Sequence, residues 1–186
     1  MYAAKIKGLM IWGQNPVVGG PNTNMERKAL ENLDWLVASD LWETETATFW
    51  RAPGVDPAKI KTEVFLLPAA SSVEKEGSIT NSGRWMQWRY EAVEPPGEAK
   101  SDLQICSEIV LKLQGLYSVD GGPNAEAITS LTWNYGRHPD PHDVAKEING
   151  YDIKTGKLLP SFSKLKDDGS TPSGNWLYYG SYTEAG

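Results

Sequence analysis

Cysteine is almost absent from this sequence, since Cys106 is the only one in 186 residues. A single thiol excludes an internal disulfide and a cysteine-built metal site within the chain. Long hydrophobic runs are absent too, because no apolar stretch approaches the roughly 20 residues that cross a bilayer. Lys5 and Lys7 interrupt the short apolar start, so we expect no signal peptide and no membrane span here.

Basic residues are in the minority. The 18 lysines and arginines face 24 aspartates and glutamates, which gives a net charge of −6 and a pI near 5.0. A phosphate backbone is normally bound through a basic surface, so nucleic acid is not expected as a partner. Aromatic residues are plentiful by contrast, with eight tryptophans and eight tyrosines. Such rings line ligand pockets and interfaces, and they fill bulky cores equally well.

The first part of the chain predicts a βαβ unit. Residues 5–12 read as a buried strand, and Trp35–Ala38 reads as a second one that ends at Ser39-Asp40. Between them, Thr23 as N-cap with Glu26 three residues later is a capping-box pattern that opens a helix. We expect a right-handed crossover. The helix would bury four residues spaced about four apart: Met25, Ala29, Leu30 and Leu33.

The middle of the chain predicts a third strand. A helical turn is expected near Glu43–Trp50, and residues 51–61 read as a loop because proline and glycine punctuate them. Glu63–Leu67 is the third strand, which Pro68 stops. Residues 71–90 read as extended, and Pro95-Pro96-Gly97 is a firm break.

One clear amphipathic helix follows over residues 102–116, with Ser101 or Asp102 as its cap. Its apolar stripe predicts five buried residues: Leu103, Cys106, Ile109, Val110 and Leu113. Two short helices and a loop-rich tail are expected after it, over 125–133, 141–149 and 154–186.

These elements predict an α/β fold with two parts. Residues 1–120 would form a Rossmann-like three-layer domain with a mainly parallel sheet. Residues 121–186 would form an irregular helical and loop extension that packs on this domain or on the rest of a longer protein. No internal repeat is visible.

The loop W-G-Q-N-P-V-V-G-G at residues 12–20 is expected at the carboxyl edge of the sheet, where ligands of open parallel sheets bind. Asn15 can donate and accept hydrogen bonds there. Asp40 follows about 25 residues later, roughly where a Rossmann unit keeps its ribose-binding acid. The G-x-G-x-x-G pattern is absent, however. A nucleotide site and a plain strand-to-helix turn capped by Asn15 therefore both remain open.

Several motifs in order along the chain carry a resemblance to a known family: W-G-Q-N-P at 12–16, E-K-E-G at 74–77, N-S-G-R-W at 81–85, P-G-E-A-K-S-D at 96–102 and W-L-Y-Y-G-S-Y-T at 176–183. With these motifs the chain resembles the molybdopterin-dependent oxidoreductases of the dimethyl sulfoxide reductase type. Within that group it looks most like the catalytic (alpha) subunit of a membrane-associated respiratory formate dehydrogenase. The resemblance spans nearly the whole chain.

The resemblance implies a cofactor site. This chain would be a middle piece of the alpha subunit and would hold part of a bis(molybdopterin guanine dinucleotide) cofactor with molybdenum or tungsten. Asp40 would accept from guanine or ribose, and Lys75 would meet a phosphate or a pterin oxygen. Asp102 would accept from an amino group of the cofactor or act only as a helix cap. The implied contacts are Asn15, Ser39, Asp40, Lys75 and Asp102, with hydroxyls from Thr44 and Thr46 in addition.

The resemblance also implies a parent protein that oxidises formate to CO2 and passes electrons to iron–sulfur clusters. Its partners would be the remainder of the alpha subunit, an iron–sulfur beta subunit and a membrane cytochrome subunit. Export through a twin-arginine signal would place it in the periplasm. The family's cysteine cluster and its cysteine or selenocysteine metal ligand are missing from this sequence. We therefore expect no catalytic residue and no iron–sulfur cluster in this chain, which would be inactive by itself.

Two other functions stay open. The chain could be a free-standing nucleotide-binding module with Asp40 on a ribose, or a non-catalytic interaction domain whose aromatic segment Asn175–Tyr182 docks on a partner. A metal site is not expected. Cys106 lies on the apolar stripe of its helix and is predicted to be buried. His138 and His142 are predicted to be loop residues, since prolines lie between them.

A hydrolase with paired carboxylates is not expected either. Glu43 and Glu45 are two residues apart, and so are Glu74 and Glu76. No nucleophile with a partner base accompanies either pair. Both pairs are therefore predicted to be surface charge.

Overall fold

The computed structural model describes residues 1–80 and 86–173. The chain forms two compact units. The first unit consists of Met1–Ser71 and Pro95–Asp102, and the second of Ser72–Glu94 and the chain from Leu103 onward. The domain division expected at residue 120 stays a prediction.

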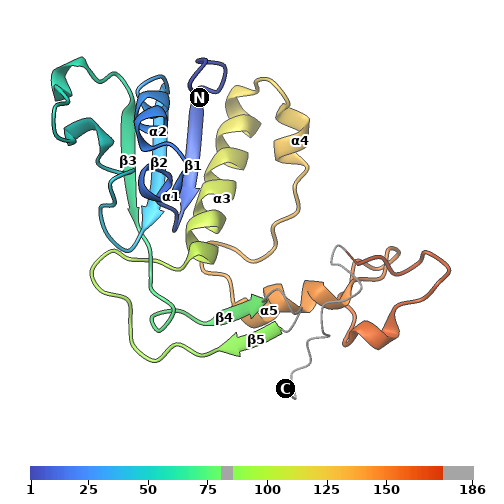
Figure 1. The fold of residues 1–186 in the computed structure, drawn as a ribbon. Coiled ribbons are helices and arrows are strands. Elements are labelled where there is room, and N and C mark those ends of the chain that lie inside the picture. The colour runs from blue at the N-terminus through green and yellow to red at the C-terminus, as the bar shows by residue number, and fades with distance from the viewer. Residues whose placement is uncertain (81–85, 174–186) are drawn as a thin grey trace. The chain divides into compact units, whose positions relative to one another are not determined.

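A parallel sheet of three strands organises the first unit (Figure 1). Strand β1 (Gly8–Trp12) pairs with β2 (Trp35–Asp40), and β2 pairs with β3 (Glu63–Pro68). The three predicted strands and their parallel direction are confirmed. Strand β1 begins three residues later than predicted, because pairing starts where Gly8 lies opposite Trp35.

Two helices lie between β1 and β2: α1 (Pro16–Gly19) and α2 (Thr23–Leu30). The cap of α2 is Asn22, whose side chain accepts from the backbone N–H of Met25 at 3.1 Å. The prediction of Thr23 as N-cap is therefore wrong by one residue. Thr23 is already the first helical residue, and asparagine caps as well as threonine does.

The core of the first unit covers one face of the sheet. Ala29, Leu30 and Leu33 are buried as predicted, whereas Met25 is 47% exposed and its predicted burial is wrong. Met25 follows the cap directly, in the first turn of α2, and its side chain stays in solvent. The helical residues pack with side chains from the sheet and from a 3-10 helix over Phe49–Arg51. Together the fully buried cluster comprises Ile11, Val17, Leu30, Leu33, Leu36 and Phe49.

The opposite face of the sheet is apolar and exposed. Met10 and Phe65 lie in one row across the strands, with Trp35 in the row beside it. The indole of Trp35 lies so close to β1 that a Cβ on Gly8 would stand 2.1 Å from Trp35 Cζ2. Only glycine fits at position 8 while this ring keeps its place. The α/β class is thus confirmed, and within the first unit α1 and α2 pack on one face of the sheet.

The second unit contains an antiparallel hairpin and the long helix. Strands β4 (Gly77–Thr80) and β5 (Met86–Arg89) pair with each other. Helix α3 spans Asp102–Asp120, four residues beyond its predicted end, and its first residue belongs to the first unit. The two short helices predicted after it are confirmed by α4 (Ala125–Thr129) and by α5 (Pro141–Ala145), which continues as a 3-10 helix over Lys146–Asn149.

The buried side of α3 differs from the predicted stripe. Cys106 and Leu113 are exposed, so their predicted burial is wrong, while Ile105 and Ser107 are buried. The cause is a polar contact that apolar periodicity does not show. Ser107 Oγ donates to the carbonyl of Gly136 at 3.2 Å and accepts from Trp133 Nε1 at 2.7 Å. The segment after α4 is therefore fastened to this side of the helix.

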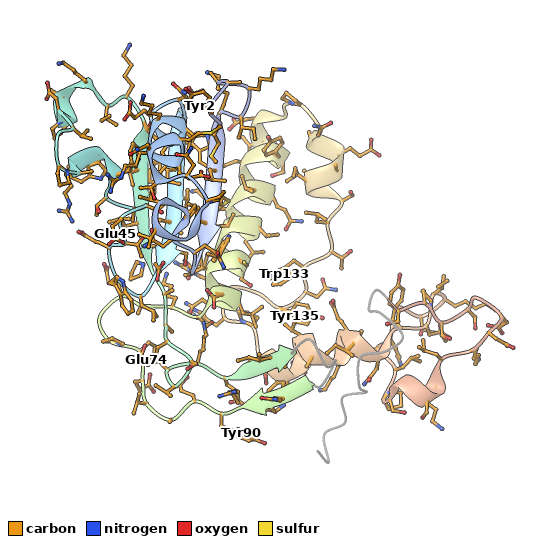
Figure 2. All side chains as sticks on the ribbon, viewed as in Figure 1. Tyr2, Glu45, Glu74, Tyr90, Trp133 and Tyr135 are labelled. Atoms are coloured by element: carbon orange, nitrogen blue, oxygen red, sulfur yellow. The ribbon has the colours of Figure 1, made fainter. Side chains whose placement is uncertain are left out.

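Two aromatic residues continue this attachment (Figure 2). Trp133 meets Tyr135 edge to face, with ring centroids 5.2 Å apart. The hydroxyl of Tyr135 donates to Glu147. Burial is the largest cause that raises the pKa of Tyr135, and the hydrogen bond to the Glu147 carboxylate is the second. The loop after α4 is thus held at both α3 and the 3-10 helix.

His142 lies in α5, so its predicted place in a loop is wrong. Pro141 occupies the first turn of α5, where its missing N–H is tolerated, and Asp140 caps the helix. Among the described residues, no three His, Cys, Asp or Glu side chains gather in a way that could hold a metal ion. The motifs N-S-G-R-W at 81–85 and W-L-Y-Y-G-S-Y-T at 176–183 lie outside the described residues.

Across residues 1–80 and 86–173, no helix is long and apolar enough to cross a bilayer.

Candidate functional site

The carboxyl ends of the three parallel strands meet at one edge of the first unit (Figure 1). Asn15 follows β1, and Ser39 and Asp40 end β2. The chain later returns to this edge. The backbone N–H of Lys100 donates to the carbonyl of Pro68 at 3.1 Å, and the Lys100 carbonyl accepts from Ala70 at 2.8 Å. The start of α3, with Asp102, is thereby brought beside the end of β3.

Asn15 joins the loop after β1 to the loop after β2. Its Oδ1 accepts from the Thr46 hydroxyl at 2.7 Å and from the Thr46 backbone N–H at 3.2 Å, while Nδ2 donates to Glu45 at 2.6 Å. Thr46 Oγ1 also accepts from the backbone N–H of Val17 at 3.0 Å. We call Asn15, Glu45 and Thr46 the edge clamp. Most of the hydrogen-bonding capacity of Asn15 is used to hold the two loops together.

Glu45 was expected to be plain surface charge, and the structure gives it a second task. It is exposed toward the ends of the strands at which the arrows point (Figure 2). A hydrogen bond from its own backbone N–H, followed by the one from Asn15, lowers the pKa of the Glu45 carboxyl, and the charge of Arg27 adds a smaller effect. The clamp therefore favours the carboxylate form.

Acid is expected to weaken the edge clamp. With a lowered pKa in the folded state, Glu45 contributes stability that is complete above its ordinary pKa of 4.5 and is lost as the pH falls through the folded value. Glu45→Gln keeps an acceptor for Asn15 but cannot titrate. We expect the difference in urea midpoint between wild type and variant at neutral pH to shrink as the pH falls below 4.5. A difference that stays constant from neutral to acid pH would contradict this.

Ser39 and Asp40 lie at the centre of the edge, because β2 is the middle strand. Ser39 is 2% exposed, and in the described part of the chain its Oγ has no hydrogen-bond partner. A buried hydroxyl without a partner costs about 1–3 kcal/mol, so such groups are uncommon. Asp40 is half-buried, and its Oδ1 accepts from the backbone N–H of Leu41 at 2.7 Å.

The threonines near this edge make hydrogen bonds within the protein. Thr44 and Thr46 are both buried. Thr44 Oγ1 accepts from the backbone N–H of Ala47 at 3.3 Å, and Thr46 Oγ1 belongs to the edge clamp. Both hydroxyls shape the loop after β2. Beside the clamp lies an open hollow of about 480 Å³, lined by Gln14, Asn15, Pro16, Val18, Gly19 and Gly20.

Lys75 lies in the second unit, so the structure does not place it relative to the other four predicted contacts. It is half-buried and directly precedes Glu76. Glu76 is not plain surface charge, since its Oε1 accepts from Trp88 Nε1 at 2.8 Å and lies 2.7 Å from His142 Nε2. Sequence reasoning missed this cluster, because Glu76 and His142 are 66 residues apart.

Comparison with known proteins identifies the family to which the chain belongs. The family model for "Molybdopterin oxidoreductase" matches residues 1–112, which is more than half of the chain. The chain therefore belongs to the molybdopterin oxidoreductase family, as its motifs suggested, and the family implies a molybdopterin cofactor. The matched range contains all five predicted contact residues.

Several relatives at 40% identity or more are formate dehydrogenase subunits. The chain is 46% identical to the formate dehydrogenase subunit alpha of Megalodesulfovibrio gigas over its full length. It is 48% identical, over 99% of its length, to the formate dehydrogenase 2 subunit alpha (cytochrome c-553) of Nitratidesulfovibrio vulgaris, and 42% identical over its full length to the nitrate-inducible formate dehydrogenase major subunit of Escherichia coli. The chain spans only 19–20% of the length of these relatives.

Proposed function

We propose that this chain is the segment of a formate dehydrogenase large subunit that holds part of a bis(molybdopterin guanine dinucleotide) cofactor. The observation that carries the proposal is the buried Ser39 hydroxyl, which has no partner among the described residues and lies next to Asp40 at the centre of the strand-end edge. A polar ligand at this edge would satisfy that hydroxyl, and the family is one whose members use a molybdopterin.

The donors and acceptors at the edge fit a nucleotide-like group. The Asp40 carboxylate would accept from guanine N–H groups or from a ribose hydroxyl, and Ser39 Oγ can donate and accept beside it. Asn15 would hold the loop that faces the ligand. Lys75 and Asp102 would add a cation and a second carboxylate. When bound, the metal and its pterins supply the two-electron chemistry, while this chain binds and orients them.

The exposed face of the sheet would be covered by a further part of the parent protein. A parallel sheet is normally covered on both faces, and here Met10, Trp35 and Phe65 leave one face apolar and exposed. We propose that a second helical layer covers this face, which would give a Rossmann-like three-layer domain over residues 1–120 with an extension over 121–186.

The relatives are formate dehydrogenase subunits, which supports a parent protein with that activity. It would oxidise formate to CO2 and pass electrons to iron–sulfur clusters, with molybdenum or tungsten at the centre. The rest of the alpha subunit, an iron–sulfur beta subunit and a membrane cytochrome subunit would be its partners. It would work in the periplasm.

The test is the guanine content of the full-length large subunit, purified and heated to release its nucleotide. Asp40→Ala is expected to lower guanine per protein, because the loss of one charge-assisted hydrogen bond of about 1.4 kcal/mol weakens the binding constant about tenfold. Asp34→Ala is the matched control. It removes an exposed aspartate at the other end of β2 whose contact with Lys7 is a surface ion pair. Unchanged guanine content in both variants would refute the proposed site.

A further inference from the structure

Trp12 opens the W-G-Q-N-P motif, and the proposed function assigns it no role. It is the last residue of β1 and pairs in register with Ser39 of β2. Successive side chains of a strand point to opposite faces of the sheet, and the preceding Ile11 belongs to the buried core cluster. Trp12 therefore points to the other face of the sheet, on which Met10 is 39% exposed.

The Ser39 side chain lies on this same face of the sheet. Leu36 packs in the core, so Ser39, three residues later in β2, points the other way. The register places Trp12 on one side of Ser39 and Leu67 of β3 on the other. Neighbouring strands are about 4.8 Å apart. The indole therefore stands next to the buried hydroxyl that has no hydrogen-bond partner among the described residues.

The indole of Trp12 has room beside it. Trp12 is half-buried, and within residues 1–80 and 86–173 its side chain donates no hydrogen bond and stacks on no other ring. The backbone N–H of Gly13 donates to the Ser39 carbonyl at 2.9 Å, which sets Gly13 beside the end of β2. A Cβ on Gly13 would meet no atom within 4 Å apart from its chain neighbours. Position 13 thus presents no obstacle to a flat group that extends from Trp12 toward Asp40.

We propose that Trp12 is a further binding residue, on whose indole the guanine ring of the cofactor stacks while polar atoms of the nucleotide meet Ser39 and Asp40. The inference rests on the proposed function, because it takes Asp40 as the contact to the nucleotide. Bases stack on aromatic side chains through their flat faces, which leaves their polar edges free for hydrogen bonds. The two kinds of contact are therefore compatible, since the indole takes the ring face and the carboxylate takes the edge.

The experiment measures guanine content and folding of the full-length large subunit in three variants. Trp12→Leu keeps an apolar side chain but removes the flat ring, so guanine content is expected to fall several-fold. Trp12→Phe keeps an aromatic face and should retain most of the content. Trp35→Phe is the matched control, because Trp35 lies on the same face but at the first residue of β2, away from the carboxyl ends of the strands. Its guanine content should match wild type.

The outcomes separate this inference from the proposed function. Equal guanine content in folded Trp12→Leu and Trp12→Phe would overturn the stacking, because packing against other protein needs only apolar volume. Full content in Trp12→Leu beside a loss in Asp40→Ala would also overturn it and leave the function standing, whereas full content in both would remove the function as well. If Trp12→Leu does not fold, Trp12→Ile decides, because β-branched side chains are favoured in strands. Full content in folded Trp12→Ile would then overturn the stacking.

Discussion

Replacing Phe49 by alanine is expected to lower the free energy of unfolding of the first unit by about 3–5 kcal/mol. Phe49 is 1% exposed and belongs to the cluster that includes Leu36 of the central strand. A loss of this size is a large share of the 5–15 kcal/mol that typically keeps a domain folded.

Urea unfolding followed by circular dichroism measures this effect as a shift in the midpoint. Trp42→Ala is the matched control, because Trp42 is an aromatic residue of the same connection but is 70% exposed. Its removal should change the midpoint little. Equal shifts in the two variants would show that Phe49 is not a core residue.

Asn15→Ala is expected to cost about 1–3 kcal/mol and to lower the guanine content of the full-length subunit. The variant leaves the buried Thr46 hydroxyl and the Thr46 backbone N–H without their acceptor. It also removes two of the links between the loop after β1 and the loop after β2, so that the hydrogen bond from Val17 N–H to Thr46 Oγ1 holds them with less support. The loop that lines the 480 Å³ hollow would then lose its fixed position.

A second substitution at the same place separates the hydrogen bonds from the charge. Asn15→Asp keeps an acceptor for Thr46, but it sets a carboxylate against Glu45, whose oxygen lies 2.6 Å from Asn15 Nδ2. Like charges at this distance repel, so the variant should be unstable at neutral pH and recover in mild acid. Gln14→Ala, an exposed neighbour, serves as the control for both. Stability and guanine content that match wild type in Asn15→Ala would show that the clamp is not needed.

The sequence predicted the sheet because its evidence is local. Each strand is a short apolar run that a glycine, a polar pair or a proline ends, and three such runs suffice for a parallel sheet. Errors arose where two residues can do the same task, as with Asn22 and Thr23 at the cap of α2. They also arose in α3, which is apolar on more than one side, so its period did not decide between Cys106 and Ser107.

The site could be predicted only in part. The family resemblance located Asn15, Ser39, Asp40 and Asp102 on segments that the first unit does bring to one edge. Their roles as cofactor contacts remain predictions. The partners of Asn15 and Glu76 could not be foreseen, because they lie 12 to 66 residues away in the chain and depend on how loops fold back.

The close approach of Trp35 to Gly8 has a consequence for how this family can drift in sequence. Any side chain at position 8 would occupy the volume of the indole, since its Cβ would stand 2.1 Å from a ring carbon. Position 8 therefore cannot gain a side chain while the indole keeps its place, whereas Trp35 can be replaced by a smaller residue without a clash. A homologue that carries alanine or a larger residue in place of Gly8 should carry a smaller residue in place of Trp35. The two positions, which face each other on β1 and β2, should therefore co-vary.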